Sequence, residues 1–113
     1  IEDGMETIYF DFDKFHIRAD MQNRVTNDAS VANGAASKYS LKLEGNCDEW
    51  GSDEYNFALG LRRSNTVKKS LLAEGVEANR ITMVSYGESN PTCTLKTEDC
   101  WTKNRRVDFK LLP

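Results

Sequence analysis

The chain alternates apolar and polar residues in four short segments, the period of a β-strand with one buried face. Residues 7–12 show it first, because Ile8, Phe10 and Phe12 occupy alternate positions. The same alternation returns in three later segments, residues 39–44, 80–86 and 106–111. The pattern therefore predicts four strands.

Two segments between these strands carry apolar residues at helical spacing. The first covers residues 19–33 and is followed by Gly34, a residue that commonly ends helices. The second covers residues 53–74, with Ser52 as the N-cap and two acidic residues in the first turn. Residues 88–103 are rich in turn-forming residues and are expected to form a loop.

The predicted order is strand, helix, strand, helix, strand, strand. This order indicates the α/β (α+β) class, a two-layer sandwich in which two helices cover one face of a mixed four-stranded sheet. The length of 113 residues is that of one domain, so we expect residues 1–113 to form a single domain.

Composition narrows the classes of partner. Apolar residues make up 39% of the chain and charged residues 29%, which favours a packed core over disorder. Fifteen Lys and Arg residues against 18 Asp and Glu residues give a net charge of −3, so nucleic acid is not an expected partner. No apolar run approaches the ~20 residues of a membrane-spanning helix. The chain begins at Ile1 without a leader, so we expect a fragment or a processed form.

One arginine interrupts the apolar face of the second predicted helix. Four residues spaced four apart share the side that faces the sheet, with Asn56 close by: Leu59, Arg63, Val67 and Leu71. Burying an arginine is costly unless an anion meets it. Two interpretations stay open: Arg63 meets the anion of a ligand, or it reaches the surface or pairs with an internal acid.

Residues 45–51 join the second strand to this helix with two glycines and several polar residues. Loops at the carboxyl ends of strands commonly bind ligands in α/β proteins, and a helix N-terminus adds free N–H groups. Asp11, near the end of the first strand, can reach the same edge. Together with Asp11, three residues would form a small site of both charge signs: Asp48, Asn56 and Arg63. Such a site suits a ligand that carries an ammonium and a carboxylate.

Catalytic and metal-binding alternatives have weaker support. Asp11-Phe12-Asp13 is similar to the aspartate pair of haloacid-dehalogenase-type phosphatases, but Phe15 stands where Thr or Val is expected. Cys47 and the single histidine, His16, could form a thiolate and base, although a lone cysteine is more often a small buried residue. Three cysteines and one histidine lack the paired spacing of a metal site, so neither metal nor cofactor is expected.

Cys93 and Cys100 lie in the same predicted loop. A disulfide between them would close a short loop in an oxidising compartment, and this is the favoured interpretation. The alternative is a pair of free thiols in a cytosolic protein.

Five spaced motifs occur in the order found in OmpA-like peptidoglycan-binding domains, which the chain resembles over nearly its whole length. The motifs are IYFDFDK at 8–14, EGNCDEWG at 44–51, YNFALGLRR at 55–63, VSYGE at 84–88 and NRRV at 104–107. The resemblance implies non-covalent binding of the peptidoglycan stem peptide through its diaminopimelate residue, without catalysis.

The resemblance also implies which residues bind. The family's ligand contacts correspond to seven positions here: Phe10, Asp11, Asp48, Asn56, Leu59, Arg63 and Arg106. A guanidinium at Arg63 can take a carboxylate through two parallel hydrogen bonds, while Asp48 offers the opposite charge to an ammonium. Asn46, Cys47 and Ser64 depart from the usual family residues.

Location and partners are implied in the same way. The lipid-anchored members of the family suggest the periplasm of a Gram-negative bacterium, with attachment to the outer membrane through a lipid on a preceding N-terminal segment. They also suggest a TolB-type periplasmic protein as a partner. An OmpA-type porin or a flagellar stator subunit is the alternative of the same class, and a small Asp-dependent phosphatase or hydrolase is the alternative of another class.

Overall fold

The computed structural model describes residues 4–113, so residues 1–3 of the expected domain lie outside the described part. The strands are β1 (Ile8–Tyr9), β2 (Ser40–Asn46), β3 (Ile81–Gly87) and β4 (Arg106–Leu112). The α-helices are α1 (Gln22–Asn33), α2 (Asp53–Ala73) and α3 (Glu98–Asn104). Short 3-10 turns occur at η2 (Ala19–Met21) and η3 (Ala78–Arg80).

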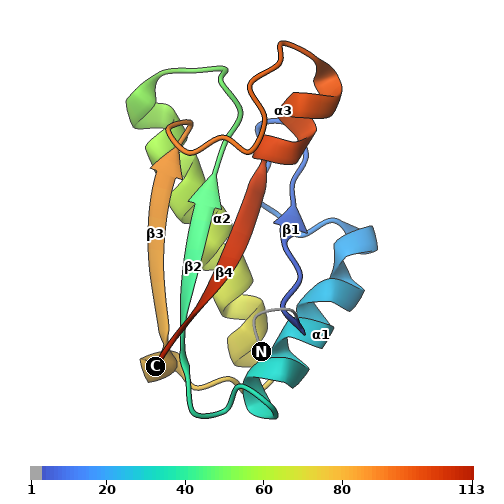
Figure 1. The fold of residues 1–113 in the computed structure, drawn as a ribbon, viewed down its shortest axis with the longest axis vertical. Helices are drawn as coiled ribbons and strands as arrows, with labels where there is room; N and C mark the ends of the chain where they lie inside the picture. Colours follow the sequence, from blue (N-terminus) through green and yellow to red (C-terminus); the bar gives the residue numbers. More distant parts are fainter. Residues whose placement is uncertain (1–3) are drawn as a thin grey trace.

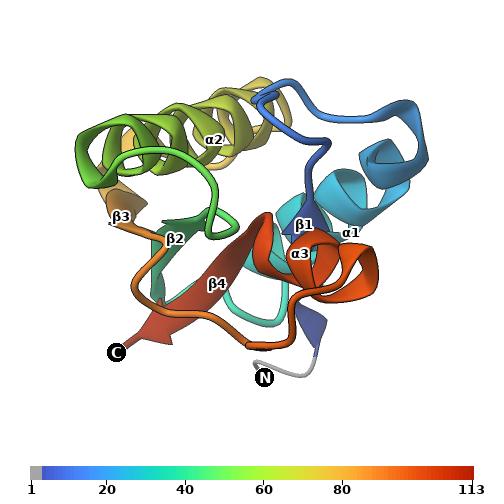
Figure 2. The same cartoon turned by 90° about the horizontal axis from the view of Figure 1, so that it is seen from above.

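The four strands form one mixed sheet in the order β1-β4-β2-β3. β2 and β3 are parallel, whereas β4 runs antiparallel to both β2 and β1. α1 and α2 cover one face of this sheet, and α3 lies at the end where β4 begins (Figures 1 and 2). The predicted two-layer fold is confirmed.

The core lies between the sheet and the two covering helices. It contains alternate residues of the strands and the inward faces of the helices, including Ile8, Leu41, Leu43, Val107, Val25, Val67 and Leu71. The predicted inward row of α2, Leu59 to Leu71 in steps of four, is buried throughout, and Arg63 in this row is fully buried. Within residues 4–113, no helix has the length and apolar character needed to cross a bilayer.

The first strand is shorter than the predicted residues 7–12. Pairing with β4 covers Ile8–Tyr9 only, and the N–H of Phe10 then bonds to the carbonyl of Arg105 at 2.9 Å. Beyond Phe10 the chain leaves the sheet, and Phe12, which the alternation placed on the core face, is 58% exposed. The physical reason is that main-chain carbonyls beyond Phe10 are hydrogen-bonded to a buried arginine instead of a strand.

The predicted loop at residues 88–103 contains a helix that the sequence pattern missed. α3 has seven residues and is capped at its N-terminus by Thr97, whose hydroxyl accepts a hydrogen bond from the N–H of Cys100 at 3.2 Å. Glu98 and Asp99 lie in its first turn, where acidic residues favour a helix start. Two turns are too short to show a helical period, so composition made this segment look like a loop.

Two glycines bring α2 directly onto β2. A Cβ atom on Gly45 would lie 2.0 Å from the carbonyl oxygen of Gly60, and one on Gly60 would lie 2.1 Å from the hydroxyl of Ser85. The helix backbone therefore rests on the strand backbone at this point. This close approach sets the depth at which the N-terminal half of α2 meets the carboxyl end of β2.

We expect Gly45→Ala to lower the free energy of unfolding by at least about 2 kcal/mol, because its Cβ meets a backbone atom that cannot move aside. Gly60→Ala is the milder matched change, since its Cβ first meets the Ser85 hydroxyl, which can rotate. Urea unfolding of both variants measures the difference. A smaller loss for Gly45→Ala than for Gly60→Ala would contradict this account of the packing.

Asp28 in α1 is a fully buried acid. Its Oδ1 accepts a hydrogen bond from the N–H of Glu6 at 2.6 Å, and its Oδ2 has no partner among the described residues. Burial is the main cause that raises the pKa of this carboxyl from 3.8 to about 7. Below about pH 7 the carboxyl therefore joins the segment before β1 to α1 mainly in its neutral form.

Asp28 gives the folding equilibrium a specific pH dependence. Between about pH 4 and pH 7 the unfolded chain ionises at this carboxyl while the folded chain keeps its proton, so the free energy of unfolding falls as pH rises. We expect Asp28→Asn to flatten this part of the profile, measured by urea unfolding across that range. The exposed Glu77→Gln is the control that keeps the native slope. A slope in Asp28→Asn as steep as the native one would contradict the assignment.

Candidate functional site

The candidate site lies at the end of the sheet where β2 and β3 finish. Three segments meet there: the loop of residues 10–18, the loop of residues 47–52 and the N-terminal half of α2. Ser52 caps α2 by accepting a hydrogen bond from the N–H of Tyr55 at 3.1 Å. Gly51 precedes it with φ of 99°, a conformation that favours glycine.

Arg63 is the central side chain of the site. Its Nε donates to the carbonyl of Lys14 at 2.8 Å, its Nη1 to that of Asn46 at 2.9 Å and its Nη2 to that of Asp11 at 3.1 Å. The guanidinium also lies over the ring of Phe10, 5.3 Å from its centroid. Burial lowers the pKa of Arg63, but a guanidinium keeps its charge in proteins. Main-chain carbonyls thus supply the acceptors that this buried charge requires.

These contacts do not occupy every N–H donor of the Arg63 guanidinium. It has five N–H donors, of which three bond to main-chain carbonyls, so two have no partner among residues 4–113. Arg63 lines a cavity of about 250 Å³, together with Asp48, Asn56 and Leu59. Four of the seven predicted binding residues therefore border one cavity.

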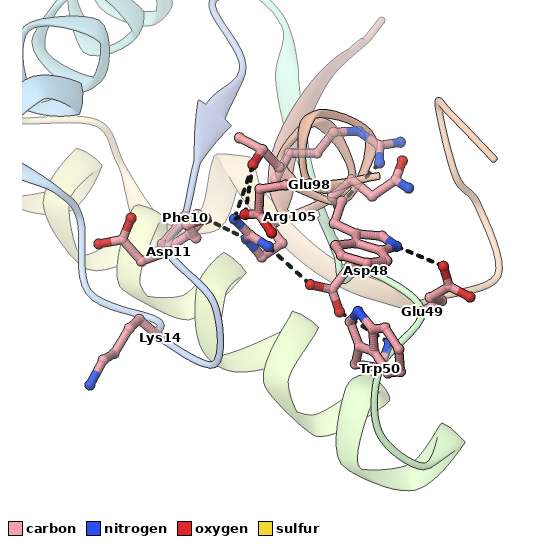
Figure 3. A network of polar contacts seen from close by, with 12 residues as sticks. Phe10, Asp11, Lys14, Asp48, Glu49, Trp50, Glu98 and Arg105 are labelled. Atoms are coloured by element: carbon pink, nitrogen blue, oxygen red, sulfur yellow. Dashed lines mark hydrogen bonds and ion pairs between the residues drawn. The ribbon is translucent and has the colours of Figure 1, made fainter. Parts of the chain in front are cut away.

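Asp48 is buried and already ion-paired. Its Oδ2 accepts from Nη1 of Arg105 at 3.1 Å, and its Oδ1 accepts from the N–H of Trp50 at 3.1 Å. Arg105 also donates to the carbonyl of Phe10 and to the carboxylate of Glu98, and Figure 3 shows its guanidinium between Asp48 and Glu98. Asp48 therefore lines the cavity as a fixed carboxylate.

Two residues of the site were not singled out for ligand binding in the sequence. Arg105 orients Asp48, and the only signal was the run of two arginines that ends at Arg106. Asp13, considered only for the phosphatase alternative, lines the cavity and accepts a hydrogen bond from the hydroxyl of Tyr55. The cavity therefore has two carboxylates at its border.

The other predicted contacts lie outside this cavity lining. Phe10 is fully buried beneath Arg63. The carboxylate of Asp11 is exposed and lies 3.6 Å from Arg18, while its carbonyl holds Arg63. Arg106 pairs with Asp108 at 2.9 Å and donates to the carbonyl of Asn90 at 3.0 Å. Phe10 and Asp11 therefore contact Arg63 without lining the cavity, and Arg106 belongs to a separate network with Asp108 and Asn90.

Asn56 joins the helix to its preceding loop. Its Nδ2 donates to the carbonyl of Trp50 at 2.9 Å and contacts Glu88 at 3.4 Å. Cys47 donates its thiol to the carbonyl of Asn56 at 3.3 Å, and burial raises the pKa of this thiol to about 11. A thiol that stays protonated at neutral pH does not suit the nucleophile considered from the sequence.

The predicted pairing of the other two cysteines is confirmed. A disulfide joins Cys93 and Cys100, whose Cα atoms are 5.4 Å apart. The bridge joins the segment before α3 to α3 itself, and Lys96 of that segment and Trp101 of α3 both contact Glu49 in the loop of residues 47–52.

Comparison with known proteins identifies the family. A model described as the OmpA family matches residues 9–105. The chain belongs to the OmpA family. The peptidoglycan-associated lipoprotein of Pasteurella multocida is 40% identical over 107 residues, covering 95% of this chain and 71% of that protein. The protein of the same name from Brucella melitensis is 39% identical over 102 residues, covering 90% of this chain and 60% of its own length.

Solved structures agree with this assignment. The crystal structure of the peptidoglycan-associated lipoprotein from Burkholderia pseudomallei has a TM-score of 0.87 and 31% identity, covering 93% of this chain and 88% of that one. The C-terminal domain of Helicobacter pylori MotB has a TM-score of 0.89 at 22% identity, covering 97% and 86%, which shows the shared fold. The chain thus spans most of these solved domains but only 60% of the Brucella relative.

Arg63 is expected to stabilise the fold as well as line the cavity. Arg63→Lys should lower the free energy of unfolding by about 2 to 4 kcal/mol, because an ammonium cannot reach three carbonyls in the planar arrangement of a guanidinium. The matched control is Arg62→Lys, an exposed neighbour, which should change stability by less than about 0.5 kcal/mol. Chemical unfolding measures both, and equal losses would contradict the structural role of Arg63.

Proposed function

We propose that residues 1–113 act as one domain that binds peptidoglycan non-covalently through the diaminopimelate residue of its stem peptide. The observation that carries the proposal is one cavity bordered by both Arg63 and Asp48, which brings a guanidinium and a carboxylate to the border of the same space. The names of the relatives in Pasteurella and Brucella, peptidoglycan-associated lipoprotein, support the same choice of ligand.

Diaminopimelate matches this arrangement because its side chain ends in both an ammonium and a carboxylate. The carboxylate would accept hydrogen bonds from the two remaining N–H donors of Arg63. The ammonium would lie against Asp48, whose two oxygens each retain accepting capacity beyond their contacts with Arg105 and Trp50. Asp13 gives the cavity a second carboxylate at its exposed side. Leu59 would contact the methylene chain between the charged groups.

The proposed activity is binding without catalysis. The Cys47 thiol has a raised pKa, and the Asp11 carboxylate lies beside Arg18 and outside the cavity lining, so neither group has the environment of a nucleophile in this cavity. The arrangement instead offers fixed donors and acceptors to a ligand of opposite charges. The residues that border this cavity therefore fit ligand binding better than they fit phosphate-ester hydrolysis.

The wider role is inferred from the relatives. We place the domain in the periplasm of a Gram-negative bacterium, attached to the outer membrane by a lipid carried on a preceding segment. In this position it would hold the outer membrane to the cell wall. A TolB-type periplasmic protein is a further proposed partner. The disulfide between Cys93 and Cys100 is compatible with an oxidising compartment.

The ligand, rather than Arg63, is the best component to change in a test, because Arg63 also holds the fold together. Sacculi whose stem peptides contain diaminopimelate differ from those with lysine by the terminal carboxylate of that side chain. We expect the native chain to bind the lysine sacculi at least about tenfold more weakly, since one charge-assisted contact is lost. Cosedimentation over a protein concentration series measures this ratio.

Competition provides the control. Free meso-diaminopimelate should release the chain from diaminopimelate sacculi at concentrations where lysine does not. Equal binding to the two walls, or no binding to either, would contradict the proposed function.

A further inference from the structure

A second cavity lies beside the first, on the other side of the loop of residues 47–52. It measures about 170 Å³ and is bordered by that loop, the segment that follows β3, the disulfide-bridged loop and α3. Side chains of mixed polarity line it, among them Glu49, Glu88, Lys96, Trp101 and Asn104. The proposed diaminopimelate site does not use these five side chains.

The two cavities adjoin. Cys47 and Asp48 line both, so one ligand can extend from the first cavity into the second. Trp50 borders the first cavity and is 51% exposed, and its ring packs edge-to-face on Trp101 of the second at 5.2 Å between centroids. The two indole rings, in contact with each other, therefore form part of the border between the two cavities.

The walls of the second cavity are held by interactions within the chain. The side chain of Asn104 accepts from the N–H of Thr92 at 2.8 Å and donates to the carbonyl of Cys93 at 2.8 Å. The indole N–H of Trp101 donates to Glu49 at 2.6 Å, and Lys96 pairs with the same carboxylate. With the disulfide, these contacts fix the wall during folding, so little ordering would accompany binding.

We propose that the second cavity is a sugar subsite, which takes an N-acetylated amino sugar of the glycan that bears the stem peptide. This inference rests on the proposed function, because peptidoglycan joins stem peptide and sugar covalently. A sugar ring has an apolar C–H face that suits an indole ring and a polar edge that suits Glu88, Lys96 and the exposed Thr94 hydroxyl. Lys96 pairs with Glu49 and Arg105 pairs with Asp48, which leaves Glu88 as the one lining carboxylate without an ion pair among residues 4–113, so the lining suits a polar occupant that donates hydrogen bonds better than an anion.

The test compares two ligands on the native chain: a diaminopimelate-containing stem peptide, and the same peptide joined to its N-acetylglucosamine–N-acetylmuramic acid disaccharide. Isothermal titration calorimetry gives the two Kd values. We expect the disaccharide form to bind about fivefold more tightly, the scale of one aromatic contact. Trp101→Ala should reduce the ratio to about one while leaving the Kd of the bare peptide within about twofold.

Two further variants separate stacking from folding. Trp101→Phe keeps an aromatic ring but loses the N–H donated to Glu49, so it should retain most of the sugar-dependent gain. Phe57→Ala removes an aromatic residue that is 51% exposed on α2 and lines neither cavity, so it should leave the ratio unchanged. Thermal unfolding by circular dichroism identifies any variant that has lost its fold.

The possible results are distinct. If the bare peptide binds the native chain and the disaccharide adds nothing, the sugar subsite is wrong and the proposed function stands. If neither ligand binds, both are wrong. If Trp101→Ala and Trp101→Phe weaken both ligands equally while remaining folded, Trp101 supports the loop and does not contact sugar, which also overturns the proposal.

Discussion

A guanidinium that is removed from water must find acceptors inside the protein, and the placement of Arg63 depends on this requirement. Its acceptors are the main-chain carbonyls of Asp11 and Lys14 in the loop after β1 and of Asn46 at the end of β2. The chain after β1 must therefore leave the sheet and curve around the arginine. The same contacts position the cavity, because the arginine that joins this loop to the end of β2 also borders the cavity.

A second charged network holds the opposite side of the cavity. Arg105 contacts Asp48, the carbonyl of Phe10 and Glu98, and so connects the loop after β2, the end of β1 and α3. Of the two charged groups that the proposed ligand would meet, Asp48 is thus ion-paired and Arg63 is hydrogen-bonded to main-chain carbonyls within the chain. A ligand would add contacts to groups that folding has fixed, which reduces the ordering cost of binding.

The periodicity of apolar residues predicted the elements whose position depends on burying an apolar face. The apolar row of α2 followed from its spacing, as did the sheet and the two covering helices, but the main-chain carbonyls that hold Arg63 were neither of the two alternatives left open for it. Periodicity could not predict the early end of β1. That end depends on the main-chain carbonyls that bond to Arg63, and the alternation of side chains carries no information about main-chain acceptors. The pairing of Arg105 with Asp48 was equally invisible, since the two residues are 57 positions apart in the sequence. α3 was missed because two turns are too few to establish a period.

A crystal structure of the chain with a peptide containing meso-diaminopimelate would test the central claim most directly. The account predicts that the terminal carboxylate of that residue lies within hydrogen-bonding distance of Arg63, that its ammonium faces Asp48, and that the three main-chain contacts of Arg63 persist. A bound peptide whose terminal carboxylate lies away from Arg63, with this guanidinium still contacting main-chain carbonyls alone, would contradict it.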